Sequence, residues 1–250
     1  MTRGVLIYAF NNGEIDYEAM ARWNAKRIKR FLGLETTIIS NSEQATAGGT
    51  RTFDGVKSQW LNASRSNAWE DSPYDETIVI DADYIVNSDL LLKLFDSPQS
   101  FLIHQTVSDA SGRNAFRGQA HFGQLTFPQS WATVFYFNRD QHNKSIFDLV
   151  KTIKENYSHF AEIYKFAHKP FRNDYAFSIA LGIVDGHIVN PTHSIPWPLA
   201  TTSTDVKVSI ENDVIHLQYK KGDRPVKSQV KGLDIHVMHK KSMEAISATS

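Results

Sequence analysis

Apolar positions along the chain follow two alternating patterns that together predict a mixed α/β fold. Continuous apolar runs at 5–10 and 77–80 have the length and the β-forming residues of strands that are covered on both faces. Between 16 and 32 the apolar residues recur at helical spacing, and Gly33 follows in the position that ends many helices. A strand at 36–40 completes a strand–helix–strand unit, which favours a parallel sheet.

Shorter segments complete the predicted fold. Further strands are expected at 101–104, 132–137, 206–210, 214–219 and 233–238, and helices at 90–95, 141–156, 159–166 and 174–181. Ser88 and Asn173 are the expected N-caps of two of these helices, and Asn212-Asp213 is the expected turn of a hairpin. We therefore expect one α/β domain over 1–250, with a central, mostly parallel sheet flanked by helices and a smaller antiparallel C-terminal part.

Charge and cysteine content narrow the function classes. The 27 Lys and Arg residues balance the 27 Asp and Glu residues, so no bulk charge draws the protein to nucleic acid or membrane. The absence of cysteine excludes disulfides, thiolate metal sites and a cysteine nucleophile. The apolar run at 5–10 is too short for a signal peptide or a spanning helix. These features predict a soluble cytoplasmic protein without a membrane partner, and they leave its oligomeric state open.

Two carboxylates directly follow the predicted strand at 77–80. In an open α/β sheet, ligands gather at the carboxyl ends of the strands, so Asp81 and Asp83 are expected to face a cleft. Two such groups can hold one hard divalent cation, Mg²⁺ or Mn²⁺, which bridges diphosphate oxygens. The alternative is a strand-end turn in which Asp81 caps the following segment.

The segment from Thr77 to Asp83 resembles the Asp-x-Asp motif of the GT-A-fold glycosyltransferases, which use nucleotide sugars. The resemblance implies that Asp81 and Asp83 carry the metal and the diphosphate of a nucleoside-diphosphate sugar, most often a UDP-sugar. It also implies a donor-binding part over about 1–105 and an acceptor-side part over about 106–250. The first strand would then hold the nucleoside through Tyr8, Phe10, Asn11 and Asn12.

Two later segments are similar to other elements of that family. The segment 171–175 resembles the acceptor-facing helix start, which implies that Asp174 is a general base in an inverting enzyme or orients a substrate in a retaining one. An acidic residue placed for the helix dipole is the alternative for Asp174.

The segment 235–241 resembles the closing element of glycogenin-like members of the family. It implies a histidine that binds the metal and a lysine on the phosphates that stabilises the leaving group. We favour His236 over His239 and Lys240 over Lys241 for these roles and expect Lys241 to contact the donor as well. A half-buried strand histidine and a solvated chain end are the alternatives.

Charge segregation suggests the acceptor. Over 219–241 seven basic residues outnumber two acidic ones, and a second basic group comprises Arg22, Lys26, Lys29 and Arg30 on the first helix. Solvated faces are the common explanation, but the first stretch is also a candidate track for a polyanion. The chain also resembles small glycosyltransferases of tailed bacteriophages, some of which modify hydroxymethylated bases in DNA. That resemblance implies a DNA acceptor in a host cytoplasm.

Other functions remain open at this point. The acceptor can instead be a glycan, a lipid or a protein, with the Gly-rich loop at 108–124 lining its cleft or lying on the surface. A metal-dependent nucleotidyltransferase or a nucleotide-binding protein is a further alternative. A nucleotidyltransferase would usually carry a Gly-rich phosphate loop after its first strand, for which Asn11-Asn12-Gly13 is too sparse.

Overall fold

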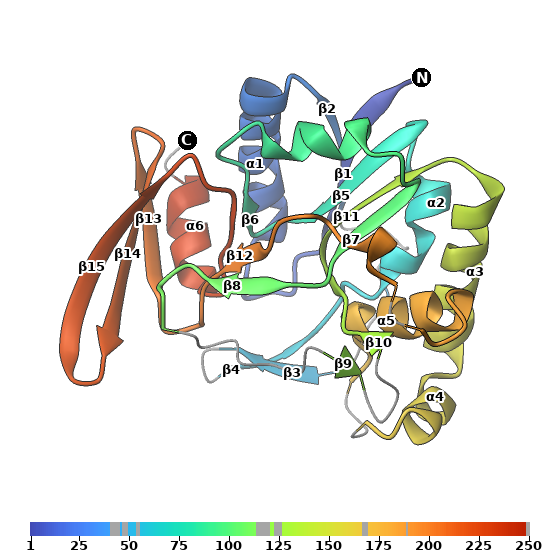
Figure 1. Cartoon of the computed structure of the whole chain (residues 1–250). Coiled ribbons are helices and arrows are strands. Elements are labelled where there is room, and N and C mark those ends of the chain that lie inside the picture. Colours follow the sequence, from blue (N-terminus) through green and yellow to red (C-terminus); the bar gives the residue numbers. More distant parts are fainter. Residues whose placement is uncertain are drawn as a thin grey trace.

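The computed structural model describes residues 1–40, 46, 50–53, 56–113, 121–122, 127–166, 170–188 and 190–248. Its central sheet has five strands in the order β2-β1-β5-β11-β7 (Figure 1). Their bounds are β1 Arg3–Ala9, β2 Glu35–Ser40, β5 Glu76–Asp81, β7 Phe101–His104 and β11 Trp131–Asn138. β1 pairs in parallel with β2 and β5, whereas β11 lies antiparallel between β5 and β7. Four of these five strands therefore run in one direction, as predicted.

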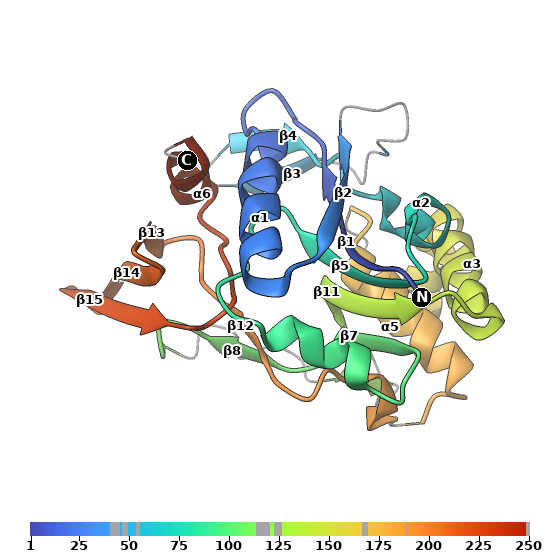
Figure 2. The same cartoon turned by 90° about the horizontal axis from the view of Figure 1, so that it is seen from above.

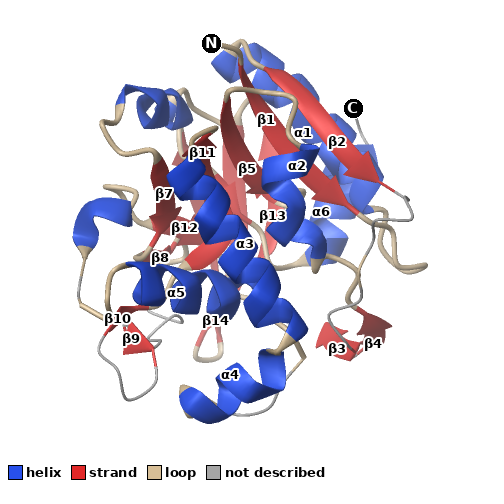
Figure 3. Ribbon diagram, turned by 90° about the vertical axis from the view of Figure 1, so that its right-hand side faces the viewer, coloured by secondary structure: helices blue, strands red, loops and turns tan. Residues whose placement is uncertain are grey.

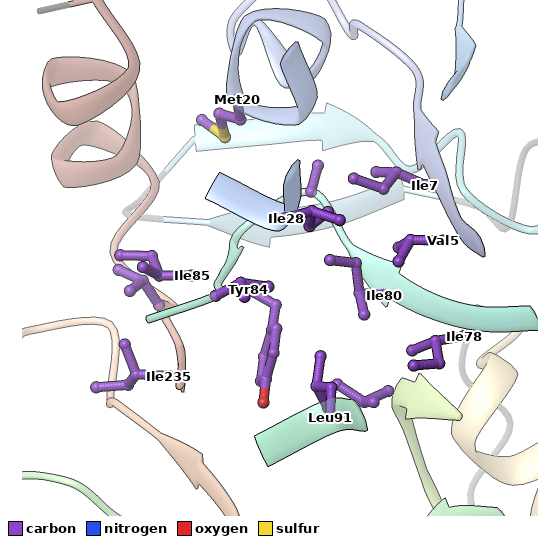
Figure 4. Packing of buried hydrophobic residues seen from close by; sticks show 14 of the residues in the cluster. Val5, Ile7, Met20, Ile28, Ile78, Ile80, Tyr84, Ile85, Leu91 and Ile235 are labelled. Atoms are coloured by element: carbon purple, nitrogen blue, oxygen red, sulfur yellow. The ribbon is translucent and has the colours of Figure 1, made fainter. Parts of the chain in front are cut away.

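Helices cover both faces of the central sheet (Figure 3). One face packs against α1 (Tyr17–Leu32), and the other packs against α2 (Ala68–Asp71), α3 (Gln141–Glu155) and α5 (Asn173–Val184). Strand alternation divides the core accordingly, because Val5 and Ile7 point to the α1 side while Leu6 points to the other. Figure 4 shows the α1-side cluster, in which residues of β1 and β5 meet those of later elements.

Two smaller sheets lie beside the central one, and most of their strands come from the second half of the chain. β6 (Tyr84–Ile85), β16 (Ile235–His236), β12 (Leu199–Thr201) and β8 (Val107–Asp109) form one in that order. The other is the antiparallel sheet β13-β14-β15, with β13 at Lys207–Glu211, β14 at Val214–Lys221 and β15 at Arg224–Lys231. Helix α6 (Lys240–Ala248) packs against β13 and α1, beside this sheet (Figure 2). The predicted antiparallel C-terminal part is therefore present.

Short elements connect these layers. They are β3 (Thr50–Phe53) paired with β4 (Val56–Gln59), β9 (His121–Phe122) paired with β10 (Phe127–Pro128), helix α4 (Tyr157–Ile163) and the 3₁₀ helices η1 (Ser64–Asn67), η2 (Leu90–Asp96) and η3 (Pro191–His193). Within the described segments, no helix combines the length and hydrophobicity needed to cross a bilayer.

The predicted end of α1 at Gly33 is confirmed, and the structure adds a cap at its start that was not predicted. Asp16 accepts a hydrogen bond from the Ala19 backbone N–H and caps the helix, and Gly33 ends it with φ 69°. The predicted turn Asn212-Asp213 joins β13 to β14 with φ of 49° and 61°, a left-handed conformation that these two residue types tolerate well.

Other local predictions were wrong. The expected helix at 90–95 is a 3₁₀ helix, and the strand expected at 233–238 is ordered as a strand only over Ile235–His236. Arg172, rather than Asn173, precedes α5, and the Asn173 amide instead donates a hydrogen bond to the Asn62 carbonyl. β15 was not predicted because its sequence is polar and carries a proline, although an edge strand tolerates both.

Candidate active site

A pocket opens where β1 and β5 end, in the position where open α/β sheets bind ligands. Its lining combines carboxylates, amides, basic groups and aromatic rings from both halves of the chain. Asp81, Asp83 and Asp174 lie on its wall together with His236 and Lys240. Residues separated by more than 150 positions in the sequence therefore meet at one site.

Two carboxylates and an imidazole converge in this pocket. Asp81, Asp83 and His236 each offer one ligand atom, and these atoms all lie within 4.8 Å of one another. Opposed ligands about 2.2 Å from a common ion are about 4.4 Å apart, so the spacing fits one divalent cation. Among the described residues, this is the one such group of three. The donor set, hard carboxylate oxygens with one imidazole, suits Mn²⁺ and related ions.

The short β6–β16 pairing positions the imidazole. Ile235 pairs with Ile85 inside the core (Figure 4). The next residue, His236, points to the opposite side of the strand and lines the pocket. Its Nε2 lies 3.5 Å from Asp83 Oδ1, and its Nδ1 lies 3.1 Å from the Thr201 hydroxyl. Burial lowers the pKa of His236 to about 4. The ring is therefore neutral at physiological pH, as a metal ligand must be.

Each carboxylate of Asp81 and Asp83 also has a cation from the protein beside it. The buried Lys240 ammonium forms an ion pair with Asp83, and the Arg65 guanidinium forms one with Asp81. Arg65 is 4% exposed, and burial lowers its pKa to about 10 while Asp174 and Tyr8 oppose that shift. The pocket therefore holds a balanced group of buried charges rather than a purely acidic one.

Asp174 is held by the protein through both carboxylate oxygens. Its Oδ1 accepts the Ala132 backbone N–H at 2.9 Å, and its Oδ2 accepts from the Arg172 guanidinium at 2.9 Å. Burial acts to raise its pKa, but Arg172, the Ala132 hydrogen bond and Arg65 together keep the pKa of Asp174 below its usual value. The side chain is therefore an ionised group of fixed orientation on the pocket wall.

The predicted nucleoside-side residues occupy different positions. Tyr8, Phe10 and Asn12 line the pocket, and the buried Tyr8 hydroxyl donates to Asp71. Burial raises the pKa of Tyr8 well above its ordinary value. The side chains of Asn11 and Asn12 accept hydrogen bonds from backbone N–H groups near the start of α1, those of Glu18 and Ile15 respectively. Asn11 is absent from the lining of the pocket.

The structure separates the two histidine–lysine alternatives at the C-terminal end. His236 and Lys240 line the pocket, whereas His239 and Lys241 line a shallow depression near β13. The His239 Nδ1 accepts the Ser242 backbone N–H at the start of α6. Lys241 is exposed to solvent beside it. The structure therefore groups His236 and Lys240 with the Asp-x-Asp segment and does not bring Lys241 there.

The Asp174 side of the pocket carries polar atoms without partners. Asn62 Oδ1, Arg172 Nε and Asn173 Oδ1 are buried, and none has a hydrogen-bond partner among the described residues. Trp60 lies beside them on the pocket wall, stacked on Phe171 at 6.2 Å between ring centroids. Orphaned acceptors and donors next to an aromatic face suit a hydroxyl-rich ligand, since buried polar groups are normally paired.

Known structures provide a comparison for this arrangement, whereas no protein family and no curated protein sequence matches the chain. The chain is similar to the glycosyltransferase GlyE of Streptococcus pneumoniae (TM-score 0.42, 12% identity, 78% of this chain and 46% of that one). It is also similar to the galactosyltransferase LgtC in complex with donor and acceptor sugar analogues (TM-score 0.44, 13% identity, 71% and 70%). A third similar structure is mouse xyloside xylosyltransferase 1 (TM-score 0.42, 10% identity, 76% and 84%).

These similarities are distant. The chain spans slightly less than half the length of the GlyE structure, and the TM-scores of all three structures lie below 0.5. The observed architecture, a mostly parallel α/β sheet with a small antiparallel sheet, is the fold class expected from the sequence. The chemistry of this chain is therefore argued from its own pocket.

Arg65 is the main residue of the pocket that sequence reasoning missed. It lies in η1, a single 3₁₀ turn with no hydrophobic period, and an arginine in such a segment is usually exposed. The loop at 108–124, which was expected to line an acceptor cleft or to lie on the surface, is described only in part. Residues 114–120 and 123–126 lie outside the described residues, and Ser111 and Arg113 contact the β14 end rather than the pocket.

Proposed function

We propose that this protein is a metal-dependent glycosyltransferase with one catalytic domain, which moves a sugar from a nucleoside-diphosphate sugar to an acceptor hydroxyl. The observation that carries the proposal is the convergence of Asp81, Asp83 and His236 at the carboxyl end of the central sheet. This donor set fits Mn²⁺ or Mg²⁺. When bound, such an ion neutralises charge on the diphosphate leaving group.

The protein's own groups would share the work on the donor. Asp81, Asp83 and His236 would hold the ion, while the ammonium of Lys240 would face the leaving diphosphate from the Asp83 side. Arg65 would add a second fixed positive charge from the Asp81 side. Preorganised charges in a desolvated pocket stabilise developing negative charge without reorganising during the reaction.

Tyr8, Phe10 and Asn12 would contact the nucleoside, since they line the same pocket at the end of β1. We retain Asn11 and Lys241 as weaker candidates for the donor site because neither lines the pocket. UDP-sugars are the proposed donors. The unpartnered atoms of Asn62, Arg172 and Asn173 would then pair with sugar hydroxyls.

Asp174 is proposed to act on the substrates as an ionised carboxylate. In an inverting enzyme it would take the acceptor proton, and in a retaining one it would orient a hydroxyl by accepting its hydrogen bond. The lowered pKa of Asp174 and its two existing hydrogen bonds favour the orienting role, because a weakly basic, engaged carboxylate accepts a proton poorly.

For the acceptor we propose DNA with hydroxymethylated bases, whose exocyclic hydroxyl would be the nucleophile, in a cytoplasm that contains such DNA. The basic residues of β14 and β15 support this choice over a neutral glycan, lipid or protein acceptor. The alternatives are tested by the same assays with those acceptors.

The deciding experiment incubates the protein with UDP-glucose, UDP-galactose or UDP-N-acetylglucosamine and measures release of UDP with Mn²⁺, with Mg²⁺ and with EDTA. We expect Mn²⁺-dependent release with at least one donor, and thermal stabilisation by UDP that requires the ion. Binding of UDP without release from any donor, with or without candidate acceptors, would assign a nucleotide-binding protein. Pyrophosphate-dependent conversion of a UDP-sugar into UTP and the sugar 1-phosphate would assign a nucleotidyltransferase.

A further inference from the structure

The basic residues of α1 and those of the sheet β13-β14-β15 have different surroundings in the structure. Lys240, which belongs to the basic stretch 219–241 of the sequence, is not counted here because it pairs with Asp83 in the pocket. On α1, Arg22 pairs with Glu18, Lys29 pairs with Glu35 and Arg30 pairs with Asp213. On β13, β14 and β15, by contrast, none of the six basic side chains forms an ion pair with an acid among the described residues. These six are Lys207, Lys220, Lys221, Arg224, Lys227 and Lys231, and all are exposed.

Strand register gathers several of these cations on one face of the sheet. Lys207 lies opposite Gln218, which lies opposite Lys227, so the three form one row across the sheet. Adjacent strands are about 4.8 Å apart, which separates the backbones of the two lysines by about 10 Å. Lys220 and Lys231 share this face by strand alternation. The shallow hollow on this face is lined mainly by polar residues, among them His216 and Gln229, and Glu211 of β13 is the acid in its lining. We call this face the basic sheet face.

Beyond β13 the sheet continues as a two-stranded ribbon. β13 pairs with β14 only as far as Gln218, so Tyr219–Lys221 and the facing residues Arg224–Val226 extend without a third strand. Figures 1 and 2 show this end lying away from the central sheet. Lys220, Lys221 and Arg224 concentrate positive charge at its tip, where Asp223 is the one acid.

Contacts on its inner side fix the ribbon to the rest of the molecule. Arg113 pairs with Asp205, donates to the Lys220 carbonyl and lies 5.0 Å from the Tyr219 ring centre. The Tyr219 hydroxyl donates to the Ser111 carbonyl at 2.8 Å. The basic sheet face is therefore a rigidly held surface, which lowers the entropy cost of using it for binding.

We propose that the basic sheet face and the ribbon tip bind the sugar–phosphate backbone of duplex DNA. Unpaired, exposed lysines can neutralise phosphates with release of counterions, whereas the paired cations of α1 offer little net charge. A two-stranded ribbon also has the dimensions that the major groove admits. The role of this contact in catalysis rests on the proposed function. DNA binding itself does not require an active donor site.

The test uses a fluorescently labelled 20-base-pair duplex and measures anisotropy at several salt concentrations. The charge variant is Lys207→Gln, Lys220→Gln and Lys227→Gln combined. The matched control is Arg22→Gln, Lys29→Gln and Lys144→Gln combined, which removes the same charge from exposed, paired positions. We expect the slope of log affinity against log salt to fall by about two to three units in the charge variant and to stay at the wild-type value in the control.

Three results would overturn the proposal. One is the absence of duplex binding at 50 mM salt, another is an equal loss in the two variants, and the third is binding to phosphatidylserine vesicles in place of DNA. Thermal stabilisation by UDP with Mn²⁺ is measured in the wild type, the charge variant and the control. It tests the donor site separately from the DNA surface. If that stabilisation is absent while the charge variant loses DNA binding selectively, the donor-site proposal fails and the DNA surface stands.

Discussion

The pocket has carboxylates at two places, the end of β5 and the start of α5, and their surroundings differ. At the end of β5, oxygens of Asp81 and Asp83 converge with an imidazole nitrogen within 4.8 Å. At the start of α5, both oxygens of Asp174 are committed to Ala132 and Arg172. Burial and nearby cations are common to both positions. Convergence of oxygens favours a metal site, whereas one hydrogen bond from the protein to each oxygen fixes the orientation of the Asp174 carboxylate and leaves acceptor capacity for a substrate.

The largest expected effect comes from Asp83→Asn. Removing this carboxylate takes a ligand from the group of three, so we expect turnover to fall on the order of 10³-fold and UDP stabilisation to lose its Mn²⁺ dependence. The same change removes the carboxylate that forms an ion pair with the buried Lys240, which costs about 3–5 kcal/mol of stability.

A double variant separates these two consequences. Asp83→Asn with Lys240→Met removes the buried charge as well, so its melting temperature should return toward that of the wild type. The Mn²⁺ response should remain lost, as measured by differential scanning fluorimetry with UDP. Recovery of that response in the double variant would contradict the ligand role of Asp83.

The next largest effect is expected for Asp174→Asn. The amide oxygen can still accept the Ala132 N–H, but the charge that pairs with Arg172 and accepts from a substrate is gone. We expect turnover to fall about 10²-fold while Mn²⁺-dependent UDP stabilisation is retained. Steady-state kinetics and the thermal assay measure the two quantities. Loss of the UDP response would instead make Asp174 part of the donor and metal site.

A smaller effect should distinguish the two histidines near the C-terminus. His236→Ala removes a pocket ligand and should weaken Mn²⁺ binding about 10- to 100-fold in calorimetric titration. His239→Ala removes the group that accepts the Ser242 N–H, so we expect a loss of about 1 kcal/mol in stability and unchanged Mn²⁺ affinity. Equal Mn²⁺ affinities in the two variants would show that neither histidine is a dedicated ligand.

The smallest effect concerns stability at acidic pH and a buried histidine outside the pocket. His104 is fully buried, its Nδ1 lies 3.1 Å from the Trp197 carbonyl, and burial lowers its pKa to about 4. Because the folded state favours the neutral ring, burial of His104 costs no protonation free energy above pH 6.5. As the pH falls from 6.5 toward 4, the unfolded state binds the proton first and the free energy of unfolding decreases.

His104→Asn should therefore remove part of the acid sensitivity. Between pH 7 and pH 4.5 the wild type should lose roughly 2–3 kcal/mol more unfolding free energy than the variant, measured by urea denaturation. UDP binding at pH 7.5 serves as the control and should be unchanged. Parallel curves for the two proteins would show that His104 is already protonated or already solvated in the folded state.

Much of the pocket wall at the ends of β1 and β5 was predictable from the sequence. The runs at 5–10 and 77–80 are apolar throughout because both faces of β1 and β5 are covered, and that pattern is visible without a structure. Parallel strands place their carboxyl ends at one edge, so the position of Asp81 and Asp83 in a cleft followed directly. Asp16 and Gly33 fixed the bounds of α1 through local capping, which needs no distant partner.

Only the tertiary structure decided which distant side chains lie beside Asp81 and Asp83 in the pocket. The choice of His236 over His239 depends on a two-residue pairing with β6, too short to leave a periodic pattern. The burial of Arg65 follows from its contacts with Asp81 and with the Ala132 carbonyl. The basic runs of α1 and β14 look alike in the sequence. Their difference in pairing is not visible there, because Asp213, the partner of Arg30, lies more than 180 positions away. Local patterns record which face of an element is buried, whereas the partners of a charge are set by the folding of remote segments onto one another.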